Sequence, residues 1–84
     1  MGRNTVATVD KLKLGDRFYI AHDKRKEVWQ IVEHRVKVTP YKTYSVWALP
    51  ASVAALDWPV GAKDKYVKAF NRNSPAVFLR NVND

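Results

Sequence analysis

The stretch from Val9 to Ile20 constrains the fold of this chain more than any other segment. Two leucines separated by a lysine lead into Gly15 and Asp16, a pair that favours a tight turn because glycine adopts positive φ freely and aspartate can bond its own backbone. Residues 17–21 then place apolar side chains on one side of an extended strand and polar ones on the other. A hydrophobic lead-in, a turn and a first long strand are typical of the start of a small β-barrel.

The rest of the chain continues this β pattern, with turn-forming residues between the apolar segments. The predicted strands are residues 4–9 (an edge strand or an ordered arm), 17–21, 27–34, 35–39, 41–49, 63–70 and 76–82. The two segments that flank Pro40 are predicted to pair as a hairpin. Apolar residues occupy both faces of 27–34, which fits a strand buried on both sides or one curled across a barrel corner.

Two segments are less regular. Pro50 to Ala62 predicts one or two helical turns opened by Pro50 and then a loop, in which Trp58 either caps the barrel or is exposed as a contact. Lys63 to Phe70 fits a helix or a strand, and we favour the strand because tyrosine, valine and phenylalanine prefer it. The sequence therefore predicts one mainly β domain over residues 1–84, a small antiparallel barrel of five to six strands with one short helical turn or lid. Its predicted core contains Phe18, Ile20, Trp29, Ile31, Phe78 and Leu79.

The composition allows one domain with a modest core. The 84 residues are 46% hydrophobic and include no cysteine, so disulfides are excluded. No apolar run approaches the roughly 20 residues of a membrane helix, and the N-terminus lacks the apolar core of a signal peptide. We therefore expect a soluble cytoplasmic protein without a membrane partner.

Charge is the strongest compositional signal. Lys and Arg number 15 against 8 Asp and Glu, which gives a formal net charge of +7. Such an excess on a small surface attracts polyanions and raises their encounter rate, which indicates nucleic acid, a nucleotide or an acidic protein surface as the partner. The alternative is that the charge only keeps the protein soluble.

The sequence offers few groups for catalysis or metal binding. His22 and His34 have no second histidine or carboxylate at helical ligand spacing, and a zinc site would need at least three ligands. The serines lie in no nucleophile elbow, and no glycine-rich phosphate loop is present. We therefore expect no enzyme activity, no cofactor and no metal. A basic ribonuclease that relies on Arg, Lys and Tyr is the alternative.

Binding of an anion is better supported, because basic residues alternate with aromatic ones in several segments. The two predicted strands around Pro40 carry only positive charges, since no Asp or Glu lies between His34 and Leu56. The predicted ligand-binding face consists of Arg35, Lys37, Tyr41, Lys42 and Tyr44, with Lys24, Arg25 and Lys26 at its edge. The alternative is that the tyrosines cover the sheet and the three consecutive basic residues form a solvated hairpin tip.

Residues 9–19 (VDKLKLGDRFY), 23–29 (DKRKEVW) and 74–80 (SPAVFLR) together resemble small phage and prophage proteins without assigned function. That resemblance implies a compact β domain with an accessory role in infection, in the cytoplasm of the host cell. The leucine, lysine, glycine, aspartate turn is also similar to the start of Tudor/KOW-like barrels, which implies a Tudor/KOW-like fold and contact with nucleic acid. The chain lacks the further glycines of KOW barrels, and it also lacks the Arg-Pro pair of the MazF-type toxins, which share its Gly-Asp strand start.

These observations predict a non-enzymatic accessory protein that binds a phosphate-bearing ligand through a basic, tyrosine-bearing face. The ligand is nucleic acid or, alternatively, a cyclic nucleotide used as a defence signal, which the protein would sequester in a pocket between subunits of a homo-oligomer. A third reading is an inhibitor that contacts a host protein, namely an enzyme whose nucleic-acid groove accepts the basic surface. Charge alone fits all three readings.

Overall fold

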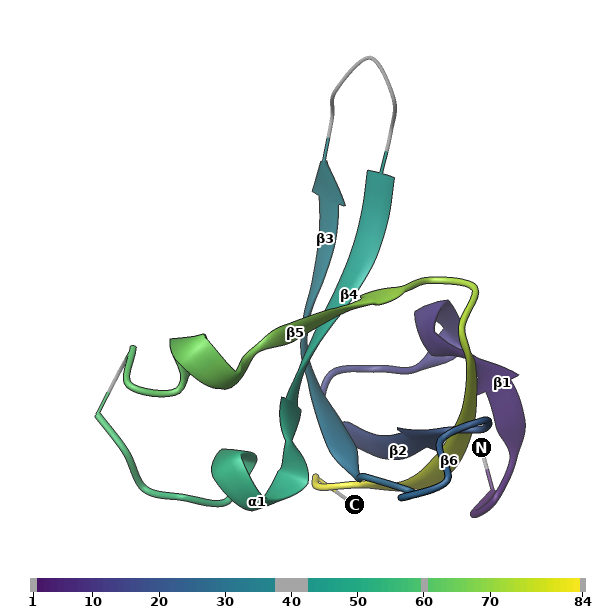
Figure 1. Cartoon of the computed structure of the whole chain (residues 1–84), viewed down its shortest axis with the longest axis horizontal. Coiled ribbons are helices and arrows are strands. Elements are labelled where there is room, and N and C mark those ends of the chain that lie inside the picture. Colours follow the sequence, from purple (N-terminus) through teal and green to yellow (C-terminus); the bar gives the residue numbers. More distant parts are fainter. Residues whose placement is uncertain (1, 38–42, 60, 84) are drawn as a thin grey trace.

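The computed structural model describes residues 2–37, 43–59 and 61–83, with the backbone alone for residues 35–37, 43 and 44. Nine elements follow one another along the described chain (Figure 1). The strands are β1 (Val6–Thr8), β2 (Asp16–Ile20), β3 (Trp29–Lys37), β4 (Thr43–Pro50), β5 (Lys68–Asn71) and β6 (Pro75–Asn81). One short helix, α1 (Ala51–Ala54), and two 3₁₀ turns, η1 (Val9–Lys11) and η2 (Asp64–Tyr66), complete the fold.

All six strands belong to one antiparallel sheet with the order β1-β6-β2-β3-β4-β5. The last strand therefore lies between the first two. This arrangement confirms the prediction of a small, mainly β, antiparallel fold of five to six strands with one short helical turn. The sheet is not closed into a barrel, because among the described residues β1 and β5 are its two edges and do not pair with each other.

The turn before β2 joins three parts of the sheet. Gly15 has a φ of 85°, its N–H donates to the Ile31 carbonyl at 2.9 Å, and its carbonyl accepts from the Val82 N–H at 3.0 Å. A Cβ at this position would lie 3.1 Å from Val82 Cγ2 and 3.1 Å from Asn83 Nδ2. Glycine is therefore required here both by its backbone conformation and by its neighbours.

Asp16 fixes the same turn from inside. Its side chain is only 5% exposed, and one carboxylate oxygen accepts from the Lys13 N–H at 2.7 Å. The other oxygen accepts at 2.7 Å from Asn81 Nδ2, which also donates to the Leu14 carbonyl at 3.0 Å. These bonds connect the first turn to the last residue of β6, and such charge-assisted bonds are among the stronger ones in proteins.

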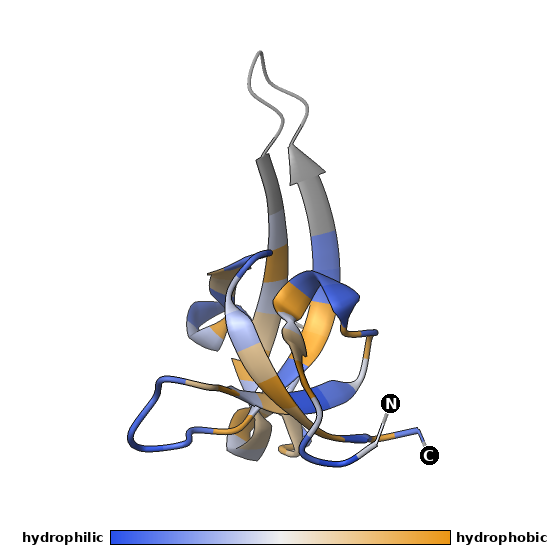
Figure 2. Cartoon of the chain, turned by 90° about the vertical axis from the view of Figure 1, so that its right-hand side faces the viewer, coloured by the Kyte–Doolittle hydropathy of each residue, from blue (hydrophilic) through white to orange (hydrophobic). Residues whose placement is uncertain are grey.

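The core lies on the inner face of the curved sheet. Phe18, Ile31 and Val46 are almost completely buried there, and the Phe18 and Phe70 rings meet edge to face at 5.5 Å. Trp29 packs on Phe70 in the same way, at 5.1 Å. Figure 2 shows hydrophobic residues concentrated in the strands and hydrophilic ones in the connecting loops.

Most of the predicted core is confirmed. Phe18, Trp29, Ile31 and Phe78 are buried, and Ile20 packs against the cluster while partly buried. The sixth predicted member, Leu79, is only half-buried. It lies at an irregularity between β2 and β6, where Arg17 pairs with Arg80 but Phe18 pairs with Phe78, so Leu79 has no partner on β2.

A bulge explains the apolar residues on both faces of β3. Ile31 pairs with Ala48 and Glu33 pairs with Trp47, so Val32 has no partner on β4. Bulges bend a strand and increase its twist. The strand therefore curls, as one of the two sequence interpretations required, and Val32 is 37% exposed rather than buried.

The strand predicted over Lys63 to Phe70 is wrong in its first half. Residues 64–66 form η2, and β5 begins at Lys68. The turn at Gly61, with a φ of 88°, starts a series of local bonds in which the Asp64 N–H donates to the Gly61 carbonyl and the Tyr66 N–H to the Lys63 carbonyl. These local bonds take the place of pairing between strands until Lys68, where β5 begins to pair with β4.

The predicted hairpin around Pro40 is confirmed by the backbone of its two strands. Arg35 pairs with Ser45 and Lys37 pairs with Thr43. β3 and β4 extend beyond the rest of the sheet as a two-stranded ribbon (Figures 1 and 2).

No helix of the described chain is long and apolar enough to cross a membrane.

Candidate functional site

The predicted basic face falls on the projecting ribbon. Arg35 and Lys37 are near the end of β3, and Tyr44 is near the start of β4, directly opposite Val36. Tyr41 and Lys42 lie outside the described residues. The backbone places Arg35, Lys37 and Tyr44 on one hairpin, but Tyr44 pairs with Val36, whose position alternates with those of Arg35 and Lys37. One binding face that contains all three residues therefore stays a prediction.

The other predicted basic group lies elsewhere. Lys24, Arg25 and Lys26 are exposed in the connection between β2 and β3, which is ordered by Asp23, whose carboxylate accepts from the backbone N–H groups of Arg25 and Glu27. They precede the first residue of β3, whereas Arg35 and Lys37 are near its last. At about 3.3 Å per residue, the nine-residue strand separates its ends by roughly 26 Å. The structure does not bring the two groups together.

A row of polar side chains that the sequence did not reveal crosses the outer face of the sheet. Arg17 on β2 lies directly opposite Arg80 on β6 and directly opposite Gln30 on β3. The Arg17 Nε–H donates to Gln30 Oε1 at 3.4 Å. We call Arg80, Arg17 and Gln30 the arginine row. Sequence alternation places Arg17 outside, but its pairing with Arg80 depends on a register set by distant parts of the chain.

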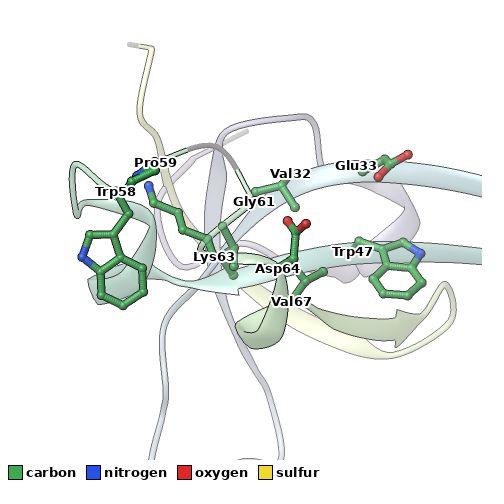
Figure 3. A pocket seen from close by; sticks show the side chains of 10 residues that line it. Val32, Glu33, Trp47, Trp58, Pro59, Gly61, Lys63, Asp64 and Val67 are labelled. Carbon is green, nitrogen blue, oxygen red and sulfur yellow. The ribbon is translucent and has the colours of Figure 1, made fainter.

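A cleft of about 570 Å³ lies on the same sheet beside the arginine row. Residues of β3 and β4 form its floor, and the connection from α1 to β5 forms its wall (Figure 3). The cleft is lined by Val32, Glu33, Trp47, Leu49, Trp58, Pro59, Gly61, Lys63, Asp64 and Val67. Because Leu49 pairs with Gln30, the cleft begins where the arginine row ends. We call it the tryptophan cleft.

The tryptophan cleft has an aromatic side chain at each end. Figure 3 shows Trp58 at one end and Trp47 at the other, with Val32, Lys63 and Asp64 between them. Trp58 is 37% exposed and its ring lies 5.6 Å from the Tyr66 ring. The Trp47 indole N–H donates to Ser45 Oγ at 3.1 Å, which fixes this ring on β4.

The charges that line the tryptophan cleft do not favour an anion inside it. Two carboxylates, of Glu33 and Asp64, face one ammonium, of Lys63. That ammonium also donates to the Ala54 carbonyl at 3.1 Å, which holds the connection against α1. The cleft is thus suited to a flat, mostly uncharged group with N–H donors, such as a nucleobase, because the Asp64 carboxylate can accept hydrogen bonds from an exocyclic amino group.

A second, smaller cleft of about 450 Å³ lies at the open end of the core. There the Lys68 ammonium lies 5.5 Å from the Trp29 ring and 5.2 Å from the Phe70 ring, within the range of a cation–π contact. Arg25 also lines this cleft, but so do Asp23 and Glu27. Its charges balance, and Lys68 covers the exposed edge of the core.

The described residues contain no group of three or more His, Cys, Asp or Glu side chains arranged to hold a metal ion. His22 lies in the connection before β3, and His34 lies within the second half of that strand.

Comparison of the chain with models of known protein families, with curated proteins and with solved structures found no match. The resemblance to phage proteins and to Tudor/KOW-like barrels stays a prediction.

Sequence reasoning missed the functional potential of three residues. Trp58 was predicted to cap the barrel or to be exposed as a contact, but not as part of the ligand-binding face, and Val32 and Arg80 were not predicted as site residues. One signal was present for Trp58, since a tryptophan followed by proline in a predicted loop lies outside the strands that build the core.

Proposed function

We propose that this protein binds a phosphate-bearing ligand along β3 and the tryptophan cleft and that it acts without catalysis. Single-stranded nucleic acid is the first candidate for this ligand. The observation that supports this most is the order of groups along β3. Gln30 joins the arginine row, Val32 and Glu33 line the tryptophan cleft, and Arg35 and Lys37 follow on the ribbon. Cations thus occur on both sides of an aromatic cleft.

Such an alternation suits the chemistry of a nucleic-acid strand. Phosphate oxygens need cations, and unpaired bases need flat surfaces on which to stack. Stacking of a base on an aromatic side chain contributes on the order of 1–3 kcal/mol, so Trp47 and Trp58 offer enough for a useful affinity. The net charge of +7 adds a sequence-independent attraction to the phosphate backbone.

Fluorescence anisotropy of a short labelled oligonucleotide, single-stranded and of mixed sequence, tests the proposal. We expect binding at low salt that weakens steeply between about 50 and 200 mM salt, because condensed counterions are released. The variant Trp58→Ala should bind about 5-fold to 150-fold more weakly, since it removes one stacking surface. Leu14→Ala is the matched control, because Leu14 is exposed and does not line the cleft.

Two outcomes would contradict the proposal. Absence of binding at low salt would exclude a nucleic-acid partner. Equal affinities of wild type and Trp58→Ala would exclude the tryptophan cleft as the site.

The size of the tryptophan cleft favours a second candidate, sequestration of a small nucleotide whose base enters the cleft and whose phosphate lies outside it, because the carboxylates of the cleft repel an anion. A volume of about 570 Å³ lies within the range of small-molecule sites, about 300–1,000 Å³. This candidate predicts that a cyclic nucleotide binds more tightly than the oligonucleotide and with little dependence on salt. The accessory role in infection and the host-enzyme inhibitor are further proposals. The inhibitor predicts that neither nucleotide nor oligonucleotide binds and that a nucleic-acid-binding enzyme is captured instead.

A further inference from the structure

The arginine row places two positive charges directly opposite each other. Arg17 and Arg80 occupy paired positions on β2 and β6. Side chains at such positions have Cβ atoms about 4.5–5.5 Å apart, and like charges there destabilise a sheet. The register therefore makes the two arginines cross-strand neighbours, an arrangement that disfavours the fold.

No carboxylate compensates this cost within the described chain. Arg17 is hydrogen-bonded to the neutral amide of Gln30, and neither arginine takes part in an ion pair among the described residues. The carboxylate nearest in sequence, that of Asp16, is buried and already accepts from Lys13 and Asn81. An external anion is the group that would neutralise the pair.

The geometry of the row selects the kind of anion. The Arg17 Nε–H is used by Gln30, which orients the guanidinium and leaves its two terminal nitrogens available. Arg80 is exposed near the end of β6, and no other described residue bonds its planar fork. Two planar forks on paired positions of neighbouring strands suit the several oxygens of a phosphate group, because guanidinium binds phosphate through paired, parallel hydrogen bonds.

A further cation lies near the row. Tyr19 is two residues beyond Arg17 on β2, hence on the same face of that strand, and the Lys26 ammonium lies 6.0 Å from its ring. Lys26 belongs to the predicted basic edge. Tyr19 and Lys26 therefore extend the outer face of β2 from Arg17 toward residues 24–26.

We propose that Arg17 and Arg80 form a clamp for one phosphate group, oriented by Gln30. The clamp deepens the proposed function, on which its biological role rests. It supplies a phosphate contact next to the tryptophan cleft, where Leu49 follows Gln30 in the same cross-strand row. The phosphate is either part of a nucleic-acid backbone or the terminal group of a free nucleotide.

Thermal unfolding with inorganic pyrophosphate as the probe tests the clamp directly. At matched ionic strength, we expect pyrophosphate to raise the Tm of the wild type above its value in chloride, because a ligand of the native state stabilises it. Arg17→Gln and Arg80→Gln should each abolish this rise. Arg72→Gln removes an exposed arginine on the turn before β6 and should keep it. An equal rise in all four proteins would overturn the clamp, since it would report a general salt effect.

Arg80→Lys separates the clamp from mere charge. Lysine keeps the positive charge but loses the planar fork, so the Tm rise should fall although net charge is unchanged. A full rise in this variant would overturn the bidentate geometry. If a glutamine substitution prevents folding, Arg80→Lys still tests the clamp.

Oligonucleotide binding distinguishes a failure of the clamp from a failure of the proposed function. With the clamp on the backbone, Arg17→Gln should weaken an oligonucleotide without terminal phosphate roughly tenfold or more. With the clamp on a terminal phosphate, it should weaken only nucleotides that carry one. If the oligonucleotide binds and Arg17→Gln has no effect on either ligand, the clamp is wrong and the proposed function stands. If no oligonucleotide binds but the pyrophosphate shift depends on both arginines, the clamp stands and nucleic-acid binding is wrong.

Discussion

On the inner face of β2, the Phe18 ring is fully buried and meets the Phe70 ring edge to face, whereas on the outer face of the same strand Arg17 lies opposite a second arginine. The two residues are neighbours in sequence. The inner contact stabilises the fold, because it removes apolar surface from water and adds an aromatic pair. The outer pairing opposes the fold, because like charges at directly opposite positions of two strands repel. One strand thus separates the part of the molecule that stabilises the fold from the part that we propose binds a ligand.

The largest expected effect comes from the inner face. Phe18→Ala should lower the free energy of unfolding by about 3–5 kcal/mol, since it removes a fully buried ring and leaves a cavity beside Phe70. Small domains have a free energy of unfolding of only about 5–15 kcal/mol, so the variant should lose a large part of its stability. Chemical denaturation followed by tryptophan fluorescence measures the loss. A loss under about 1 kcal/mol would mean that this face is not the core.

The buried carboxylate at the start of β2 should have the next largest effect. Asp16→Ala leaves the Lys13 N–H and the Asn81 amide without their acceptor and should cost about 1–3 kcal/mol. Asp16→Asn keeps one acceptor oxygen and should cost less. The denaturation midpoints of the two variants give the comparison. Equal losses would show that the bonds to Asp16 contribute little.

An aromatic deletion on the outer face sharpens the contrast. Trp58→Ala removes a larger ring than Phe18→Ala, yet it should cost less than about 1 kcal/mol, because Trp58 is 37% exposed and its ring has one aromatic neighbour, Tyr66. The same denaturation experiment measures it. A loss as large as that of Phe18→Ala would mean that the connection from α1 to β5 belongs to the core.

The smallest effect should have the opposite sign. Arg80→Gln should raise the free energy of unfolding by a few tenths of a kcal/mol at low salt, since it removes a like charge directly opposite Arg17. The gain should shrink as salt is added, because the pair is exposed to screening. Thermal unfolding at two salt concentrations tests both statements, with Arg72→Gln as the control. Destabilisation by Arg80→Gln would contradict the repulsion.

Local patterns in the sequence were sufficient for the inner face. Phe18, Ile31 and Phe78 were predicted in the core and are buried, because the apolar pattern of a strand is a property of neighbouring residues. The turn at Gly15 was predicted for the same reason, since its chemistry is that of two adjacent residues. The segment 63–67 was misread because tyrosine and valine favour a strand in general, while the turn at Gly61 imposes local bonds there.

The arrangement of the outer face could not be predicted from neighbouring residues alone. The pairing of Arg17 with Arg80 joins residues from opposite ends of the chain, and its register depends on the irregularity at Leu79. The separation of Lys24–Lys26 from Arg35 and Lys37 follows from the length of β3. Residues that are close in sequence and alike in charge were thus predicted as one surface, although a single long strand holds them apart.

The position of β6 between β1 and β2 also has a consequence for biosynthesis. The N-terminal strand is translated first, but its partner in the sheet is the last strand to be made. At about 5–20 residues per second, roughly 4–15 s pass between the synthesis of β1 and that of β6. During that interval β1 has no strand to pair with, and the β2 edge that β6 will cover is open to other chains. The nascent protein therefore completes its sheet only after β6 has left the ribosome, and a ribosome stalled before β6 would expose an unprotected strand edge to the cell.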